Sequence, residues 1–353
     1  MEHKKSGRGT TSHVANRYHQ QNYVPDPDFD QTAEDELVIS PKTKCIEVLA
    51  KSMINVVKSP DLPMDYSLNP YQGCEHGCIY CYARPTHNYW GYSAADDFET
   101  KIMVKTNALE ILKKEMCAKK YIPKPIVLSG NTDCYQPVEK KYGLTRKILE
   151  LMLEWKHPVM IITKNALIKR DLDLLDQLNQ LNLVRVAISV TASQDATRRI
   201  MEPRASSILS RLSTIRLLSK LDIPVHAMLA PIIPGINSHE IFEMVSACAD
   251  AGAKTCSYQI IRLNGDLQQI FEEWLELQMP EKKEKVLNQI KSCHGGSLAD
   301  SRFKIRMKGE GNMADIIKQQ FLLAKTKYFQ AVDLPPLNVE IFSPSKNGMR
   351  TLW

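Results

Sequence analysis

The sequence has little of what a membrane or secreted protein needs. Its 353 residues contain no run of about 18 apolar residues, so we expect no membrane-spanning helix and no membrane partner. The first eight residues lack an apolar signal core, so we expect no secretory leader. No Gly-x-Gly-x-x-Gly motif follows a first strand, which argues against a dinucleotide-binding fold.

The cysteines do not form a recognisable disulfide framework. There are nine of them without an evident pairing pattern, which favours a reducing compartment, and we expect a cytoplasmic protein. The formal net charge of +6 is a mild basic excess. It is compatible with a nucleic-acid partner, but solvated lysine faces explain it as well.

Three closely spaced cysteines are the most informative feature of the chain. Cys74, Cys78 and Cys81 have the spacing C-x3-C-x2-C. Iron–sulfur clusters select soft thiolate ligands, and three thiolates this close can hold three irons of a cubane [4Fe–4S] cluster. No fourth cysteine lies at a matching distance, since the next ones are Cys117 and Cys134. The pattern therefore predicts a cluster with one iron open to a small molecule.

The alternative is a zinc knuckle completed by His76 or His87. His76 is too close in sequence to its flanking cysteines to complete a tetrahedron, and zinc sites usually come as two ligand pairs. The cysteine spacing, with Tyr80 just before the last cysteine, resembles that of the radical S-adenosylmethionine (SAM) superfamily. There the amino and carboxylate groups of SAM chelate the open iron, so the resemblance implies two cofactors, a [4Fe–4S] cluster and SAM.

Apolar β-rich runs alternate with amphipathic helical stretches from about residue 125. The runs are 126–128, 159–162, 184–188, 225–229 and 256–261, and the helical stretches begin at Leu144, Leu172 and Ile241, the last with Ser238 as its N-cap. Repeated βα units predict an α/β fold with a parallel sheet. With a further strand before Asn69 there are about six units, which predicts a partial TIM-type (β/α)6 barrel. A doubly wound sheet is the alternative.

Composition divides the chain into four parts. Residues 1–40 are polar and predict a flexible N-terminal tail. Residues 41–265 hold the βα repeats of the barrel core. Residues 266–330 have helical patterns and predict a helical extension, and 331–353 form a C-terminal tail.

Polar residues follow successive predicted strands. They are Asn131, Thr132 and Asp133 after the second strand, Lys164 after the third, Ser189 at the end of the fourth and Pro234 beyond the fifth. In α/β folds such strand ends carry the reactive groups. Thr132 and Asp133 can accept hydrogen bonds from the ammonium of SAM, and Lys164 and Ser189 can bind its carboxylate. An apolar slot at Pro234 suits the adenine, and Tyr80 could pack on the adenine edge. Caps and turns are the alternative role for such residues.

A closer resemblance comes from motifs spread over roughly residues 40 to 330. They are the stretches 69–74, 82–87, 97–102, 131–137, 163–164, 202–204, 234–237 and 306–311. They resemble an uncharacterised branch of the radical SAM superfamily related to spore photoproduct lyase and often described as DNA-repair-photolyase-like. The resemblance implies a nucleic-acid substrate and an electron donor such as flavodoxin or ferredoxin.

The chain departs from that branch at two positions. The lyase uses a cysteine near the end of the second strand as a hydrogen-atom donor, and by motif alignment Gly130 stands there. Cys134 stands where the branch usually has proline, and a small residue filling a loop explains it. Lyase activity is therefore not assumed, and the catalytic residues stay unassigned.

Three further stretches carry charged or aromatic residues. Asp97, Glu99 and Lys101 alternate on a predicted strand, where they would face one way. Glu202 and Arg204 flank a proline and could form an ion pair. Basic and aromatic residues interleave from 84 to 92 and could stack on bases or pack over the cluster.

Two functions follow from these patterns. The first is a radical SAM enzyme that cleaves SAM reductively and abstracts a hydrogen atom from an unknown substrate, with nucleic acid as the candidate, by lyase- or transferase-like chemistry. The second is a non-catalytic iron–sulfur protein that binds nucleic acid or senses redox state. The open iron and the Lys164–Ser189 pair favour the first, since a purely structural cluster needs neither.

Overall fold

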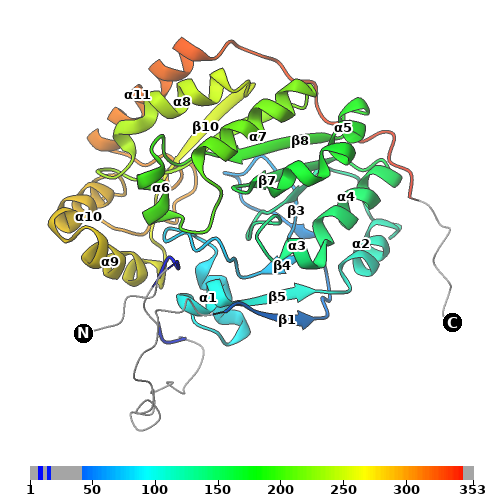
Figure 1. The fold of residues 1–353 in the computed structure, drawn as a ribbon, viewed down its shortest axis with the longest axis horizontal. Coiled ribbons are helices and arrows are strands. Elements are labelled where there is room, and N and C mark those ends of the chain that lie inside the picture. The colour runs from blue at the N-terminus through cyan, green and yellow to red at the C-terminus, as the bar shows by residue number, and fades with distance from the viewer. Residues whose placement is uncertain (1–6, 11–13, 17–41, 345–353) are drawn as a thin grey trace, which may run out of the picture.

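One seven-stranded sheet organises the computed structural model, which describes residues 7–10, 14–16 and 42–344. Its strands, in spatial order, are β10 (Thr255–Ile260), β9 (Val225–Ile232), β8 (Val184–Ser189), β7 (Val159–Thr163), β6 (Ile126–Leu128), β3 (Tyr66–Leu68) and β2 (Asn55–Val56). The strands from β3 to β10 run parallel, and β2 pairs antiparallel to β3. The predicted mixed α/β fold with a parallel sheet is confirmed (Figure 1).

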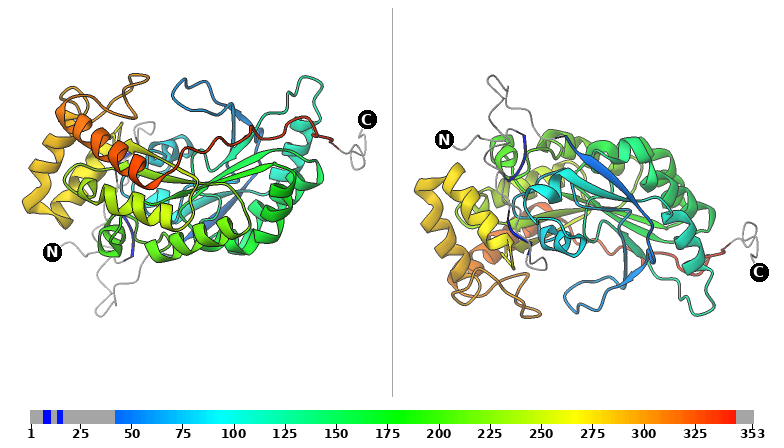
Figure 2. Two further views of the ribbon diagram at one scale, coloured as in Figure 1. Left: turned by 90° about the horizontal axis from the view of Figure 1, so that it is seen from above. Right: turned by 90° about the horizontal axis from the view of Figure 1, so that it is seen from below.

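Helices connect the parallel strands. They are α2 (Ala108–Met116), α3 (Glu139–Tyr142), α4 (Leu144–Glu154), η2 (Ala166–Asp171), α5 (Leu172–Gln180), α6 (Asp195–Met201), α7 (Ile208–Lys220), η3 (Ser238–Glu240) and α8 (Ile241–Asp250). The helices α4, α5, α7 and α8 lie along one face of the sheet (Figures 1 and 2). None of the described helices is long and apolar enough to cross a membrane.

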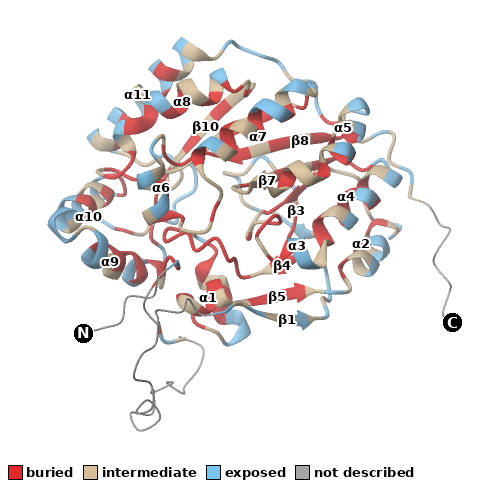
Figure 3. Ribbon diagram, in the orientation of Figure 1, coloured by how far each residue is buried: buried red, intermediate tan, exposed pale blue. Residues whose placement is uncertain are grey.

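Side-chain periodicity explains this layering. In β7, Val159, Ile161 and Thr163 are buried while the residues between them are only partly buried, so one face of the strand packs against helices. In α4, the predicted stripe is buried at Leu144 and Ile148. Figure 3 shows the buried residues concentrated along the strands and on the inner sides of the helices.

The predicted N-cap of the helix after β9 is wrong. Ser238 lies in η3, and α8 begins at Ile241 with Glu240 in the N-cap position. The Ser238 hydroxyl instead accepts a hydrogen bond from the backbone N–H of Gly235 at 3.3 Å. The Ser238 hydroxyl therefore forms its hydrogen bond within the short turn after the strand and does not cap the helix.

A second, smaller sheet carries the cysteine loop. Its strands are β1 (Lys44–Val48), β5 (Lys101–Lys105) and β4 (Tyr71–Gln72), in that order, and β4 ends just before the cysteines. The 3-10 helix η1 (Arg84–Trp90) follows the loop. The strand predicted across Asp97 and Glu99 is wrong, because helix α1 (Asp96–Thr100) occupies those positions and β5 begins only at Lys101. An i,i+4 ion pair of 2.9 Å between Asp97 and Lys101 fits the helical spacing.

The C-terminal part is helical and then extended. Its helices are α9 (Leu267–Gln278), η4 (Pro280–Lys282), α10 (Lys283–Ser292) and α11 (Asn312–Tyr328). The segment after α11 then runs past the amino ends of the strands (Figure 2). There Asn338 N–H donates to the Asn182 carbonyl and Ser343 N–H to the Trp155 carbonyl, each at 2.9 Å. The predicted tail at 331–353 thus packs against the core up to residue 344, and the remainder lies outside the described residues.

Candidate functional site at the cysteine loop

The loop that carries Cys74, Cys78 and Cys81 is pinned from several directions. All three are free thiols, and the first two are buried. Gln136 holds the loop start, because its amide donates to the Gly73 carbonyl at 2.9 Å and accepts from the Glu75 N–H at 3.0 Å. The loop is thus tied to the segment after β6 and has little freedom to unfold on its own.

A buried ion pair supports the other end of the loop. Arg84 donates to the Cys78 carbonyl at 3.0 Å and forms a pair of 2.5 Å with Glu99, and neither side chain is exposed. Breaking one partner of such a buried pair is strongly destabilising, since the other charge is left without compensation. The cysteine loop therefore depends on α1, where Glu99 lies.

A short N-terminal segment, called here the strap and formed by residues 7–10 and 14–16, docks on the same loop. The Glu99 carboxylate accepts hydrogen bonds from the backbone N–H of Gly9 at 2.9 Å and of Thr10 at 3.1 Å. A Cβ at Gly9 would lie 1.6 Å from the carbonyl oxygen of Gly77, so only glycine fits. The predicted flexible tail is corrected for these residues, and the rest of 1–40 lies outside the described residues.

A second buried ion pair lies on the other side of the cysteines. The Glu202 carboxylate accepts hydrogen bonds from Tyr80, Arg211 and, at 2.8 Å, Thr191. Burial by itself would raise the pKa of Glu202, but Arg211 and then Lys164 outweigh it and lower that pKa to about 2. The expected Glu202–Arg204 ion pair is wrong, because Arg204 lies 3.4 Å from Glu75 instead. Glu202 is therefore charged, and by accepting the hydrogen bond from the Tyr80 hydroxyl it fixes the position of that ring.

Lys164 extends from the end of β7 toward the cysteines. Its ammonium lies 5.8 Å from the centroid of the Tyr80 ring. Burial lowers the pKa of Lys164, but Cys78 and then Glu202 outweigh this effect and raise it. In turn, burial and then Glu202 raise the pKa of the Cys78 thiol to about 12, against the opposing effect of Lys164. The structure thus places the Lys164 ammonium near Tyr80, within the loop that carries the predicted iron ligands.

Ser189 lies at the same edge of the sheet. Thr163 at the end of β7 pairs in register with Ile188, the residue before Ser189 in β8. Ser189 is buried, and its carbonyl accepts a hydrogen bond from Arg211 at 3.1 Å. Lys164 and Ser189 therefore follow neighbouring strands, as predicted, and their contact with SAM stays a prediction.

The three residues predicted after β6 are bonded within the protein. Asp133 accepts hydrogen bonds from the Thr163 hydroxyl and the Lys164 N–H, both at 2.8 Å. Thr132 donates to the Tyr71 carbonyl at 2.6 Å. Asn131 faces a separate pocket described below. Asp133 thus holds the backbone of Lys164 in place, and its predicted contact with the SAM ammonium stays a prediction.

The loop after β9 is fixed by one amide side chain. Asn237 donates to the Thr191 carbonyl at 2.7 Å and accepts from the Ile233 N–H at 2.6 Å. Pro234 is buried in the turn between them, before Gly235 with a φ of 78°. The Tyr80 hydroxyl donates a hydrogen bond to Glu202. The contacts of the Tyr80 ring and of Pro234 with adenine stay predictions.

Neither histidine supports the zinc alternative. The Nε2 atom of His76 lies 3.0 Å from the Asn165 amide nitrogen, which can only donate, and its Nδ1 atom lies 3.5 Å from Asp133. His87 is buried against the rings of Tyr92 and Phe98. Within the described residues, no three His, Cys, Asp or Glu side chains converge as ligands of one metal ion would.

The donor set fits a cubane cluster. Each thiolate of a cubane binds a different iron, so the three sulfurs need not converge on one point. Burial is the largest cause of the raised pKa of the Cys74 thiol and of the raised pKa of the Cys78 thiol. The nearby thiols of Cys78 and Cys81 raise the pKa of Cys74 further, and the thiol of Cys81 raises that of Cys78. Clustered free thiols beside a lysine match the predicted chemistry.

Arg211 and Gln136 are site residues that the sequence interpretation missed. Arg211 lies on α7 at the buried face that Ile208 and Leu212 also occupy, so a charged residue within an apolar helical stripe was the available signal. Gln136 lies in the motif stretch 131–137, but its role was not predicted, since its partners lie in the cysteine loop, far away in sequence.

Comparisons with known proteins identify the family of the chain. Residues 68–248 match the family model of the radical SAM superfamily. An uncharacterized protein of Mycobacterium bovis is 33% identical over 238 residues, which cover 67% of this chain and 70% of the relative. An uncharacterized protein of Methanocaldococcus jannaschii is 28% identical over 248 residues, which cover 70% of this chain and 88% of the relative.

The fold is similar to that of spore photoproduct lyase. The structure of that enzyme complexed with dinucleoside spore photoproduct superposes with a TM-score of 0.59 at 17% identity, over 81% of this chain and 79% of the other. A mutant of the lyase with bound AdoMet gives a TM-score of 0.58 at 16% identity and the same coverage. At this identity the likeness establishes the fold alone. By the match to the family model, which spans just over half of its residues, the chain belongs to the radical SAM superfamily.

Proposed function

We propose that the protein is a radical SAM enzyme. In this proposal Cys74, Cys78 and Cys81 would hold a [4Fe–4S] cluster. When bound, the cluster would supply the electron for reductive cleavage of SAM into methionine and a radical that takes a hydrogen atom from the substrate. The partial (β/α)6 barrel is the matching architecture, with the cluster at the carboxyl ends of its strands. A cytoplasmic location and an electron donor such as flavodoxin or ferredoxin complete the proposal.

The observation that carries the proposal is Lys164 beside the cysteines. An ammonium over the Tyr80 ring, which lies between two of the proposed iron ligands in sequence, would provide a charge-assisted hydrogen bond for a carboxylate that binds the open iron. Asp133 fixes its backbone, and the Glu202–Arg211 pair fixes the Tyr80 ring next to it. A cluster with a purely structural role has no need of such a cation.

The test is formation of 5′-deoxyadenosine. Anaerobically reconstituted protein is reduced with dithionite and incubated with SAM, and the products are separated by liquid chromatography. We expect 5′-deoxyadenosine from the wild-type protein and none from Cys78→Ala. An intact, reduced cluster that yields no 5′-deoxyadenosine would favour the second candidate, a non-catalytic iron–sulfur protein.

For the substrate we propose a nucleic acid. The support is the likeness in fold to a lyase that was solved in complex with a dinucleoside photoproduct, together with the net charge of +6. Gly130 provides no thiol where the lyase has its hydrogen donor, so the reaction is proposed to differ from that of the lyase. Transfer of deuterium from labelled substrate into 5′-deoxyadenosine would identify the molecule that is attacked.

A further inference from the structure

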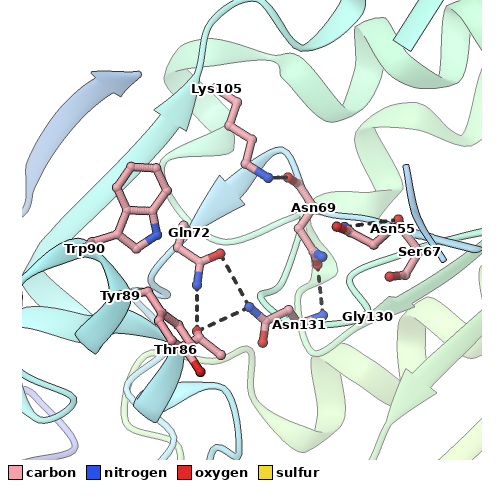
Figure 4. A pocket seen from close by; sticks show the side chains of 10 residues that line it. All are labelled: Asn55, Ser67, Asn69, Gln72, Thr86, Tyr89, Trp90, Lys105, Gly130 and Asn131. Atoms are coloured by element: carbon pink, nitrogen blue, oxygen red, sulfur yellow. Dashed lines mark hydrogen bonds between the residues drawn. The ribbon is translucent and has the colours of Figure 1, made fainter. Parts of the chain in front are cut away.

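A polar pocket of about 340 Å³ lies between the two sheets, beside η1 (Figure 4). Its wall includes Tyr89 and Trp90 from η1, Lys105 from the end of β5, and Gly130 and Asn131 from the loop after β6. No lining residue is acidic, so the one charge in the wall is the positive charge of Lys105.

Lys105 is a half-buried cation without an anionic partner. Its ammonium donates one hydrogen bond, to the Asn69 carbonyl at 2.8 Å, out of the three it can make. Among the described residues, no carboxylate oxygen lies within ion-pair distance of it. Burial lowers the pKa of Lys105, and Glu115 partly opposes this effect from a distance. An anion in the pocket would supply the missing counter-charge.

The carboxamides beside Lys105 are held loosely. The Asn131 amide reaches Gln72 and Thr86 only at 3.4 Å each, which is long for a hydrogen bond. The Asn55 amide likewise reaches the Ser67 carbonyl at 3.4 Å. These amide groups can turn toward a ligand at small cost and donate hydrogen bonds to its oxygens. Figure 4 shows where they lie around the pocket.

The pocket mouth carries two exposed aromatic rings. Tyr89 is 74% exposed and Trp90 41% exposed, whereas Arg84 and His87 of the same short helix are fully buried. Within the stretch 84–92, Tyr89 and Trp90 are therefore the residues that we expect to stack on bases. Nucleobases stack on aromatic rings, so flat rings near a cation favour a nucleotide.

We propose that this pocket binds a phosphorylated nucleoside, with the phosphate at the Lys105 ammonium and the base against Trp90. The site is separate from the Lys164 site and does not depend on SAM cleavage. A free nucleotide and a nucleotide unit of a single strand share this chemistry, and the two are distinguished by the test.

The test is equilibrium dialysis of the reconstituted protein with four probes: thymidine 5′-monophosphate, thymidine, inorganic phosphate and a 5′-phosphorylated oligothymidylate. We expect the monophosphate to bind at least tenfold more tightly than thymidine or phosphate. Lys105→Met and Trp90→Ala should each weaken that binding about tenfold, while the exposed Lys114→Met and Phe242→Ala serve as matched controls without effect. Tighter binding of the oligomer than of the monomer, lost in Lys105→Met, would assign the pocket to a strand, and the reverse to a free nucleotide.

A second pair of variants separates ligand binding from folding. Lys105→Arg keeps the positive charge and should retain binding of the monophosphate. Asn131→Asp adds a negative charge and should abolish this binding with little change in thermal stability. Equal affinity of the monophosphate and thymidine, or unchanged affinity in Lys105→Met, would overturn the proposal. Displacement of the monophosphate by SAM would overturn it as well, since the nucleotide would then occupy the SAM site. Formation of 5′-deoxyadenosine, measured on the same preparation, tests the proposed function independently.

Discussion

Glu202 and Arg211 form an ion pair in which neither side chain is more than 1% exposed. Glu202 follows α6 and Arg211 lies on α7, so the pair ties two successive helices together beneath the Tyr80 ring. Because Arg211 also donates to the Ser189 and Ser206 carbonyls, the pair fixes the end of β8 as well. The predicted SAM-binding edge is thus held by groups that are not themselves predicted to bind SAM.

The Glu202 carboxylate should contribute to stability in a pH-dependent way. Its pKa is lowered to about 2 from an ordinary value of 4.5, so its contribution is full above about pH 4.5 and is lost as pH falls toward 2. Glu202→Gln should lower the free energy of unfolding by about 3–5 kcal/mol at neutral pH, because Arg211 is left uncompensated. Urea unfolding of both proteins from pH 7 to pH 3 measures the difference. A difference that grows toward low pH would contradict the assignment.

The three cysteines should be individually required for the cluster. Cys74→Ala, Cys78→Ala and Cys81→Ala should each lose the brown colour and the roughly four irons of one cubane. Cys117→Ala and Cys134→Ala should keep both, since neither lies in the loop. Iron and sulfide content and the visible absorbance of anaerobically purified protein are the measurements. Loss of iron in Cys134→Ala would mean that the cluster has a fourth protein ligand and no open iron.

Lys164 and Ser189 should matter for SAM and not for the cluster. Lys164→Ala should weaken SAM binding by about 1.5–3 kcal/mol, or roughly 10- to 100-fold, through loss of a charge-assisted hydrogen bond. Ser189→Ala should have a smaller effect in the same direction. Titration of SAM against the cluster spectrum measures both, with the exposed Lys220→Ala as control. Wild-type affinity in Lys164→Ala would remove this lysine from the site.

The strap should protect the cysteine loop. Gly9→Val places side-chain atoms where the Gly77 carbonyl lies, so the strap should detach. We expect faster loss of the cluster in air, followed by the decay of visible absorbance, and faster cleavage of the N-terminal segment by trypsin. Ser301→Val is the control, because this position is exposed and lies outside the strap and the helices. Equal decay rates for Gly9→Val and wild type would show that the strap contributes no protection.

Binding of nucleic acid should depend on salt. Each neutralised phosphate releases counterions, so affinity should fall as salt rises from about 50 to 200 mM. With a net charge of only +6, few phosphate contacts are expected, and the slope of log affinity against log salt should be shallow. Filter binding of single-stranded and duplex DNA and RNA over this range is the measurement. Absence of any binding at low salt would direct the search to peptide or small-molecule substrates.

Features that depend on local patterns could be predicted from the amino-acid sequence. The C-x3-C-x2-C spacing marks the cysteine loop, since ligand chemistry is carried by neighbours in sequence. The runs that became β6, β7, β8, β9 and β10 were found because each of these strands buries apolar side chains, on about every second residue or more. Their parallel order was enough to place Lys164 and Ser189 at one edge of the sheet.

The pairing of buried charges and the docking of the strap, in contrast, could not be predicted before the chain was seen folded. Glu202 pairs with Arg211 on the next helix and not with Arg204, two residues away, because Pro203 leaves the two side chains pointing to different neighbours. The strap reaches Glu99 across some 90 residues of sequence, and no local pattern encodes such a contact. Asp97, Glu99 and Lys101 alternate as in a strand, yet the first two lie in helix α1, where Glu99 contacts Arg84 and the strap. Buried charges follow the partners that the fold brings to them, and those partners are distant in the chain.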